Sequence, residues 1–447
     1  MTAPLADLTA RLLDAARKAG AEAADALAVH GTSLTIDVRR GALEQAERAE
    51  GTEIGLRVLF GGRQACVSAS DLSDRTIAAL AERAVAMARE APDDPYAGLA
   101  DPGQIAREWD LAALDLTDAA AEPDAAMLEA DCRAVEAAAL ASKGITQVEA
   151  SAGYSARAMH LAASNGFSGG YARTSRSISA VAFTGEGTGM ERDWAGESRT
   201  YQSDLPGAEG IGALAAERAL ARAGAVKPVT GTYPVLFDER VASSLIGHLL
   251  SAVNGAAVAR GASWLRDALG TQVLPEGLSV IEDPHRARIS SSRPFDGEGL
   301  PTRRRAIVEN GILTGWTLDL ATGRKLGMES TANAARGTSS PPSPATSNID
   351  LTQGTRSRED LIRDMGTGLY VTSMIGSTIS PTTGDYSRGA AGFWVQNGVI
   401  SHPVNECTIA GNLRDMLLRL IPANDARAHL STRVPSCLID GLTLAGA

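Results

Sequence analysis

The first part of the chain alternates between helical and extended patterns of apolar residues. Residues 6–18 are rich in Ala, Leu and Arg at helical spacing, and the pattern stops at Gly20, a residue type that follows many helix ends. Leu34, Ile36 and Val38 then alternate with polar neighbours. Because successive side chains of a strand point to opposite faces, this alternation predicts a half-buried strand.

A second amphipathic helix is predicted after Ser73, a favourable N-cap residue, and before Pro92. Its predicted apolar face consists of Ile77, Leu80, Ala84, Met87 and Ala88. Together, these helices and strands predict an α+β domain over residues 1–100. The stretch at 91–103 (APDDPYAGLADPG) is rich in Pro, Asp and Gly and predicts a linker.

The middle of the chain repeats this combination. Helical spacing occurs at 127–142 and again at 207–223. Extended patterns lie between them at 147–163 and 175–183, and the second of these places small hydroxyl residues on one side. These segments predict a central α+β domain over residues 101–225.

The remaining residues, 226–447, predict a third domain that is rich in strands and loops. A short apolar strand at 233–237 precedes two helical patterns, at 241–254 and 256–269. The rest of this region consists of short extended segments separated by turns. The whole sequence therefore predicts an α+β protein, with N-terminal α/β layers of mixed helices and meander strands and a C-terminal β-rich domain with a few helices.

Turn signals in the third region are strong. Asn310-Gly311 and Asn397-Gly398 each lie between alternating segments and predict tight hairpins. A Pro/Ser-rich stretch at 337–347 (GTSSPPSPATS) predicts a long loop. Loops of this length are commonly functional or mobile.

Charge and composition narrow the class of protein. The 447 residues carry a formal net charge of −11, which argues against a nucleic-acid or anionic-membrane surface, since both need clustered Lys and Arg. The N-terminus lacks the basic start and apolar core of a signal peptide, and no apolar stretch reaches about 20 residues. The four cysteines form no C-x-x-C pair. We therefore expect a cytoplasmic protein without nucleic-acid or membrane partners.

The six histidines lack the spacing of a helical zinc-peptidase motif. That motif needs two imidazoles on one side of a helix and a glutamate beside the first, which activates metal-bound water. After His248, Leu249 stands in place of the glutamate, and Ala252 and Val253 stand where a second histidine is needed. The pattern favours a buried helix with one polar residue; a zinc site assembled from distant residues is the alternative.

Other candidate side chains lie in two Gly-rich loops. Asp296 and Glu298 precede one predicted strand, and Asp385, Ser387 and Arg388 begin another. Such residues either bind a peptide backbone or a partner, or hold their own loops through Asp caps and Asp–Arg pairs. The sequence favours neither interpretation over the other.

Cys407 is a candidate nucleophile only if a base or a positive charge lowers its pKa. His402 lies five residues before it, but Pro403 and strand geometry argue against contact between the two side chains. The sequence favours an inert, buried thiol.

Longer segments are similar to a known family. PFDGEGLPTRRR (294–305) with the following NGIL resembles the DDEG-x-P-T…NG-x-L signature of the TldD/PmbA family. STANAARG (330–337), which contains Arg336, resembles its S-T-G-N-x-x-R. GDYSRGAAGFWV and PVNECTIAGNL, within 384–413, are very similar to a block of the PmbA branch, also called TldE. GTEIGLRVLFGGRQACVSASDLS, near the N-terminus, also matches, so the resemblance covers essentially the whole chain.

The resemblance implies a family of cytoplasmic metallopeptidases that act on unfolded peptides, some of which are called modulators of DNA gyrase. In the TldD branch, a helix carries H-E-x-x-x-H and binds zinc. The TldE branch is its heterodimer partner, with the active site facing an enclosed chamber. The corresponding helix here contains His248, Leu249 and Val253. The resemblance therefore implies the TldE branch, with no cofactor bound by this chain and zinc in a TldD-like partner subunit.

These observations lead to three hypotheses about function. The leading hypothesis is a non-zinc subunit that completes the chamber, binds unfolded peptide and is inactive alone. The alternative is a stand-alone homodimeric peptide-binding or regulatory protein without hydrolytic activity. The third is an independent hydrolase using Asp296, Glu298 or Cys407. The candidate residues for binding substrate or partner are Asp296, Glu298, Arg336, Asp385, Ser387 and Arg388.

Overall fold

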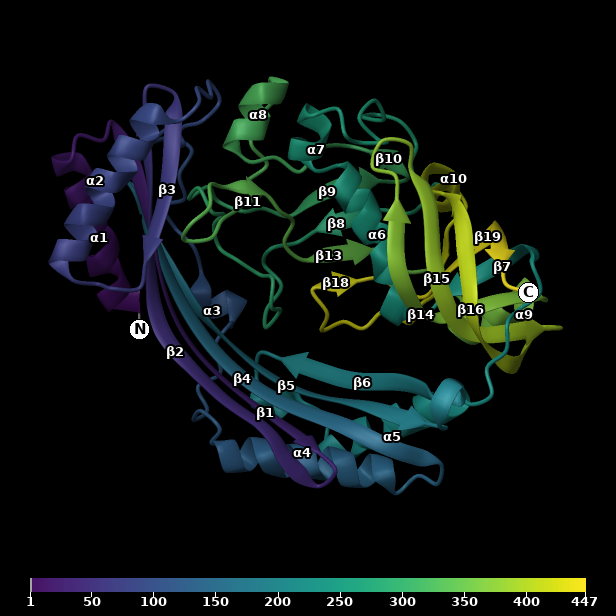
Figure 1. Ribbon diagram of the computed structural model, residues 1–447. Coiled ribbons are helices and arrows are strands. Elements are labelled where there is room, and N and C mark those ends of the chain that lie inside the picture. The colour runs from purple at the N-terminus through teal and green to yellow at the C-terminus, as the bar shows by residue number, and fades with distance from the viewer. Residues whose placement is uncertain (1) are drawn as a thin grey trace.

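The protein is built from one long curved sheet and a β-rich domain on the inner side of that sheet (Figure 1). The structure, a computed structural model, describes residues 2–447, with side chains from Pro4 onward. It confirms the predicted α+β class, with helices and meander strands in the N-terminal half and mainly strands in the C-terminal domain. Among the described residues, no helix has the length and apolar character needed to cross a membrane.

The long sheet is antiparallel throughout, in the order β3-β2-β1-β4-β5-β6. Its strands are β1 (Ala23–Arg39), β2 (Ala42–Phe60), β3 (Arg63–Ala69), β4 (Ile145–Ala163), β5 (Ser168–Thr184) and β6 (Glu191–Arg199). Because β1 pairs directly with β4, the regions predicted as first and central domains contribute to one continuous sheet. The division of the chain into three domains stays a prediction.

Four long helices cover the outer face of this sheet (Figure 1). They are α1 (Thr2–Lys18) and α2 (Asp74–Glu90) at one end, and α4 (Ala125–Leu140) and α5 (Ala208–Ala221) at the other. On β1, Ala26 packs under the first pair and Ile36 under the second. Both residues have even numbers and therefore point to the same face of the strand. Single turns form α3 (Leu111–Leu114), η1 (Gly187–Gly189) and η2 (Gln202–Asp204).

Helix α2 begins where the sequence predicts. The Ser73 hydroxyl accepts a hydrogen bond from the Thr76 backbone N–H at 3.3 Å, which satisfies one of the free donors at the helix start. Four of the five residues predicted on its apolar face are buried: Ile77, Leu80, Ala84 and Ala88. The placement of Met87 on that face was wrong, because the side chain is 47% exposed. It precedes Ala88 by one residue, about 100° around the helix.

The C-terminal domain contains two sheets (Figure 1). The first has the order β10-β9-β8-β13-β18, made of β8 (Val280–Glu282), β9 (Arg305–Glu309), β10 (Ile312–Leu313), β13 (Ile349–Leu351) and β18 (Thr432–Arg433). The second has the order β16-β15-β14-β7-β19-β17, made of β7 (Gly231–Phe237), β14 (Gly368–Ile379), β15 (Asp385–Gln396), β16 (Val399–Asn412), β17 (Ile421–Pro422) and β19 (Cys437–Ala445). Since β16 also pairs with β19, this sheet closes into a barrel. A separate pair joins β11 (Ala334–Ala335) to β12 (Ser343–Pro344).

The two predicted Asn-Gly hairpins are confirmed, one between β9 and β10 and one between β15 and β16. Asn310 and Gly311 have φ of 48° and 82°, and Asn397 and Gly398 have φ of 54° and 74°. Positive φ at both central residues is what a two-residue hairpin turn of this kind requires.

Helix α6 (Glu239–Ala252) packs between the two sheets, in one apolar core with residues of β7, β14, β8 and β9. The domain also contains α7 (Gly255–Ala259), α8 (Leu320–Leu326), α9 (Arg358–Met365) and α10 (Leu413–Leu418). The predicted helix at 256–269 was wrong beyond Ala259. Gly261, with φ of 70°, ends it, and the Gly261 and Ala262 N–H groups bond back to Val258 and Ala257 at 2.9 Å each.

The inner face of the long sheet meets the C-terminal domain through an apolar cluster that joins Leu27 and Leu161 to Phe295. The segment predicted as a linker, 91–103, has no helix or strand. It is nevertheless packed here, and Ala100 is 4% exposed. The 337–347 loop also lies against the sheet, because a Cβ added to Gly55 would be 2.1 Å from the Thr338 carbonyl oxygen.

Candidate functional site

Helix α6 is the first candidate, since it follows β7 directly and carries His248. Asp238 caps it by accepting a hydrogen bond from the Arg240 backbone N–H at 3.1 Å. One side of the helix is core: Leu249 and Val253 are fully buried and Ala252 is 4% exposed. The opposite side carries Ser244, His248 and Ser251, which are half-buried or exposed.

The His248 imidazole lies against the Tyr386 ring of β15, edge to face, with 5.9 Å between ring centroids. Its Nε2 atom is buried and has no hydrogen-bond partner among the described residues. Burial, and then the charge of Arg388, lower the pKa of His248. The side chain is therefore a neutral imidazole at neutral pH, packed on an aromatic ring.

The three candidate residues on β15 contact different parts of the protein. Arg388 donates from Nε to the Gly376 carbonyl at 2.8 Å and from Nη1 to the Ser244 hydroxyl at 3.4 Å, which brings it next to α6. Asp385 instead accepts hydrogen bonds from Thr383 Oγ1 at 2.6 Å and Asn412 Nδ2 at 3.1 Å, which lower its pKa. Ser387 lies between them, paired with Thr378 of β14 and Ala410 of β16.

Asp296 and Glu298 lie in the contact between the C-terminal domain and the long sheet, and are 2% and 8% exposed. Asp296 accepts hydrogen bonds from three backbone N–H groups, those of Glu298, Leu300 and Ala334, at 2.9 to 3.0 Å. Glu298 accepts one from the Leu320 N–H at 2.8 Å. Burial and the neighbouring Asp296 raise the pKa of Glu298 to about 8. These contacts hold loops in place; binding of substrate or partner by these residues stays a prediction.

Arg336 belongs to the same contact. Its guanidinium pairs with Asp25 of β1, which also pairs with Arg57 of β2 at 2.5 Å. All three side chains are at most 4% exposed. Asp25 and Arg57 were not among the residues predicted from the sequence, although each is a charged residue within an apolar strand segment, which is a recognisable signal. Their pairing in register, Asp25 opposite Arg57, depends on the fold.

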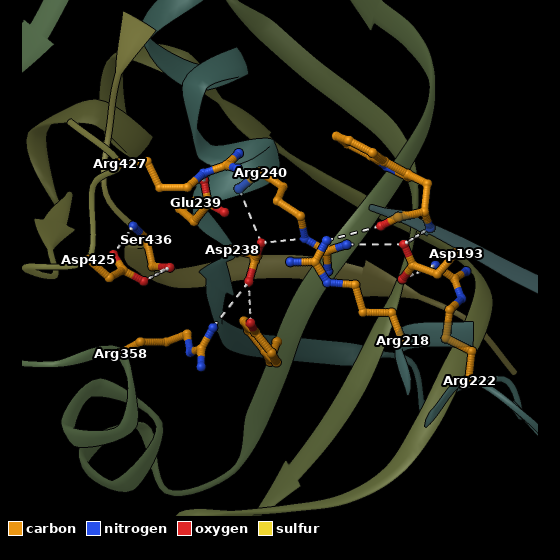
Figure 2. Close-up of polar contacts among 12 residues, drawn as sticks. Asp193, Arg218, Arg222, Asp238, Glu239, Arg240, Arg358, Asp425, Arg427 and Ser436 are labelled. Atoms are coloured by element: carbon orange, nitrogen blue, oxygen red, sulfur yellow. Dashed lines mark hydrogen bonds and ion pairs between the residues drawn. The ribbon is translucent and has the colours of Figure 1, made fainter. Parts of the chain in front are cut away.

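A second charged cluster, also missed, joins the other end of the long sheet to the start of α6 (Figure 2). Arg240 pairs with Asp238 at 2.8 Å and with Asp193 of β6 at 3.0 Å, and these side chains are 4–6% exposed. Asp238 also accepts a hydrogen bond from the Tyr370 hydroxyl. Burial alone would raise the pKa of Asp238, but Arg240 and Tyr370 outweigh it and lower that pKa.

The residues of α6 do not fit a catalytic zinc ion, which needs three protein ligands and an open position. His248 is the one imidazole on the helix, and apolar core side chains occupy the positions that would complete the motif. Among residues 2–447, no group of three or more His, Cys, Asp or Glu is arranged to hold a metal ion. Cys407 is 4% exposed, and burial raises its pKa to about 11, as expected of an inert thiol.

Comparison with known proteins identifies the family. Residues 230–446 match the model of the PmbA/TldA metallopeptidase C-terminal domain. Domain 1 and the central domain of the same group match residues 24–88 and 108–223. The chain belongs to the TldD/PmbA family of metallopeptidases. The resemblance noted from the sequence is thereby confirmed.

Relatives within the TldD/PmbA family match along nearly the whole chain. The sequence is 38% identical to Metalloprotease PmbA of Escherichia coli O157:H7 over 93% of this chain and 90% of that protein. It is 34% identical to a PmbA homolog of Haemophilus influenzae over 97% of this chain and 94% of that protein.

Solved structures of the TldD/PmbA type agree with the fold. A Bacteroides thetaiotaomicron protein described as a modulator of DNA gyrase matches with a TM-score of 0.92 at 28% identity, over 99% of this chain and 98% of its own. TldE of Thermococcus kodakarensis matches with a TM-score of 0.85 at 19% identity, over 98% and 100% of the two chains. At that identity, the second likeness shows the fold alone.

Proposed function

We propose that this chain is the non-zinc subunit of a two-part metallopeptidase that degrades or processes unfolded peptides. It completes the chamber, contributes peptide-binding surface and hydrolyses nothing alone. Its partner is a TldD-like subunit that supplies the zinc ion, and the complex works in the cytoplasm.

The observation that carries this proposal is the composition of α6. In a metallopeptidase family, the position of the zinc helix is used here for core packing, with Leu249 and Val253 fully buried. His248 is left as one neutral imidazole beside Tyr386. A chain that keeps the family fold without the ligands retains what the fold supplies besides metal chemistry, namely surfaces for a partner and for peptide.

The test is co-expression with a zinc-bearing homologue from the same organism, followed by purification through a tag on this chain. We expect a stable complex, zinc in the partner, and hydrolysis of an unfolded casein digest that neither subunit achieves alone and that a chelator abolishes. Elemental analysis of this chain alone is the matched control. One zinc ion per chain together with solo peptidase activity overturns the proposal, and so does failure to associate with the homologue.

A further inference from the structure

Strand β6 forms the last edge of the long sheet: one side of its backbone pairs with β5, and the other side pairs with no strand among residues 2–447. Main-chain groups of alternate residues in an antiparallel strand point to the same side. Trp194 marks the outward set, since its N–H donates to its neighbour Asp193 at 2.7 Å and its carbonyl accepts from Arg218 at 3.0 Å. By alternation, Gly196 and Ser198 also direct their main-chain groups outward.

The outer edge of β6 lies along the contact with the C-terminal domain, and the two ends of the strand differ. Near its start, the ion pair between Asp193 and Arg240 and the hydrogen bond from Asn405 to Glu191 fill this contact. Towards its end, from Gly196 to Thr200, the contact opens into a groove of about 360 Å³. That volume falls within the range of about 300–1,000 Å³ found for ligand sites.

The groove has a polar floor and a second wall. Hydroxyl side chains of β5, from Ser175, Ser177 and Ser179, line it, and residues 427 and 429–431 form the facing wall. Trp194 stands at its edge with 46% of its surface exposed. From Gly196 to its end at Arg199 the strand extends about 10 Å, at about 3.3 Å per residue, which is room for about three residues of an extended chain.

The charged groups of the groove are already paired with one another. Glu197 contacts Arg199 at 2.5 Å, Arg427 at 3.1 Å and His429 at 3.0 Å. Arg288, at the far end, pairs with Asp115 at 2.7 Å and with Asp204 at 3.2 Å. Among the described residues that line the groove, no charged side chain is therefore left free to select the side chains of a ligand. The Ser198 carbonyl already accepts a hydrogen bond from Arg199 Nη1 at 3.0 Å, and the Ser175 and Ser198 hydroxyls lie 3.1 Å apart. The groups on offer are the main chain of Gly196, the Ser198 N–H and the hydroxyls of Ser177 and Ser179.

We propose that this groove binds an extended segment of unfolded peptide, which adds to the free edge of β6 as a further strand. Main-chain hydrogen bonds to both groups of Gly196 and to the Ser198 N–H hold the segment, and the Trp194 ring and the serine hydroxyls contact it. Recognition through the backbone tolerates many sequences. The inference rests on the proposed function, in which this chain binds peptide, and it places the peptide-binding site in the groove beside β6.

The test compares two substitutions at one residue. Ser198→Pro removes the outward N–H, and the edge position tolerates proline because this N–H does not bond to β5. Ser198→Ala keeps the N–H and removes the hydroxyl. Binding of a dye-labelled, end-blocked octapeptide of alternating Ser and Val is followed by fluorescence anisotropy. We expect at least a tenfold loss of affinity for Ser198→Pro and less than a twofold change for Ser198→Ala.

A second measurement needs no variant and so covers the case in which Ser198→Pro fails to fold. The same octapeptide, N-methylated at its four central residues, lacks donors on both edges, and we expect at least a tenfold weaker affinity for the unaltered chain. Equal affinity for the methylated and unmethylated peptides overturns the inference.

Failure of this inference is distinguishable from failure of the proposed function. Peptide affinity unaffected by Ser198→Pro, or absent in a chain that still associates with the zinc-bearing homologue, overturns the groove and leaves the subunit role standing. Peptide affinity that depends on Ser198, in a chain that ignores the homologue, supports the groove and overturns the subunit role. Absence of both binding and association overturns both.

Discussion

At the scale of single residues, burial decides what Leu249 of α6 can do. Leu249 is fully buried in the core between the two C-terminal sheets. Leu249→Glu places a carboxylate there, and an unpaired buried charge costs about 3 kcal/mol or more of unfolding free energy. We expect that loss in urea denaturation followed by circular dichroism, with no gain of bound zinc.

Ser251→Glu, on the exposed side of the same helix, is the matched control, with an expected change within about 0.5 kcal/mol. If Leu249→Glu is as stable as this control and binds zinc, α6 retains the capacity for a metal site and the account of its core role is wrong.

Glu298 makes stability depend on pH. Burial, followed by repulsion from Asp296, raises its pKa to about 8 in the folded protein, against about 4.3 in an unfolded chain. Between these values the folded state holds a proton that the unfolded state has released. The stability from this site is therefore fully present below about pH 4 and is lost as pH rises through about 8.

Glu298→Gln keeps the acceptor for the Leu320 N–H and removes the titration. We expect denaturation midpoints of the unaltered chain to fall from pH 5 to pH 8, and those of the variant to fall less. Parallel curves for the two proteins would show that Glu298 does not titrate in this range. Asp296 has a raised pKa of the same origin, so the variant keeps part of the slope.

The sequence predicts some residues of the site and misses others. It points to Asp296 and Glu298 because acidic residues in Gly-rich turns are conspicuous, and both lie at one contact, with Arg336 beside them. It does not identify Asp25 or Arg57 as their neighbours, because these lie on strands more than two hundred residues earlier. Asp385 and Arg388 are close in sequence yet bond in different directions, which local spacing does not reveal.

At the scale of elements, predictions succeed where the signal is local. The cap at Ser73 and the two Asn-Gly turns depend on a few adjacent residues and are confirmed. Two-residue strands such as β17 and β18 exist only through partners elsewhere in the chain, and no pattern of that length predicts them. The helix at 256–269 fails because Gly261 ends it and the apolar residues beyond, Trp264 and Leu265, enter the core as a loop.

Gly398 is a test at this scale. It has φ of 74°, and an added Cβ would lie 2.8 Å from the Arg363 carbonyl oxygen. Gly398→Ala therefore combines backbone strain with a clash, and we expect a loss of more than about 1 kcal/mol. Thermal melting measures it.

Gly51→Ala is the control. Gly51 lies in β2 with nothing within 4 Å of the added Cβ and no positive φ, so we expect an unchanged or slightly higher melting temperature. Equal melting of the two variants would mean that the β15–β16 turn adopts another conformation.

At the scale of the whole molecule, the continuity of the long sheet could not be predicted from composition or from the linker-like segments of the sequence. β1 and β4 pair from Asp25 opposite Ala163 to Arg39 opposite Glu149, although more than one hundred residues separate the two strands in sequence. The Pro- and Gly-rich segment at 91–103 marks a change of element, yet it is packed where the sheet meets the C-terminal domain. Which distant strands pair depends on how the complete faces of the sheet pack against the helices and the C-terminal domain. A local sequence pattern does not contain that information.

Two buried charged clusters fasten the C-terminal domain to this sheet, and Arg336 belongs to the one at β1 and β2. Arg336→Met leaves Asp25 with one guanidinium in a buried site. Arg57 still pairs with Asp25, so the carboxylate loses one of two partners, and leaving one buried acceptor unsatisfied costs about 1–3 kcal/mol. We expect a loss of that size and faster proteolysis of the 337–347 loop, which follows Arg336 directly. Arg83→Met, on the exposed side of α2, is the control.

A double-mutant cycle separates the contact from general damage. Because Asp25 and Arg336 are in direct contact, the effects of Asp25→Asn and Arg336→Met should not add. Once Asp25 is neutral, the buried Arg336 guanidinium has lost its charged partner and its removal costs less, so we expect the double variant to be more stable than the sum of the single losses predicts. Additive losses would show that the two side chains do not interact, and that other contacts, such as the apolar cluster around Phe295, hold the sheet and the domain together here.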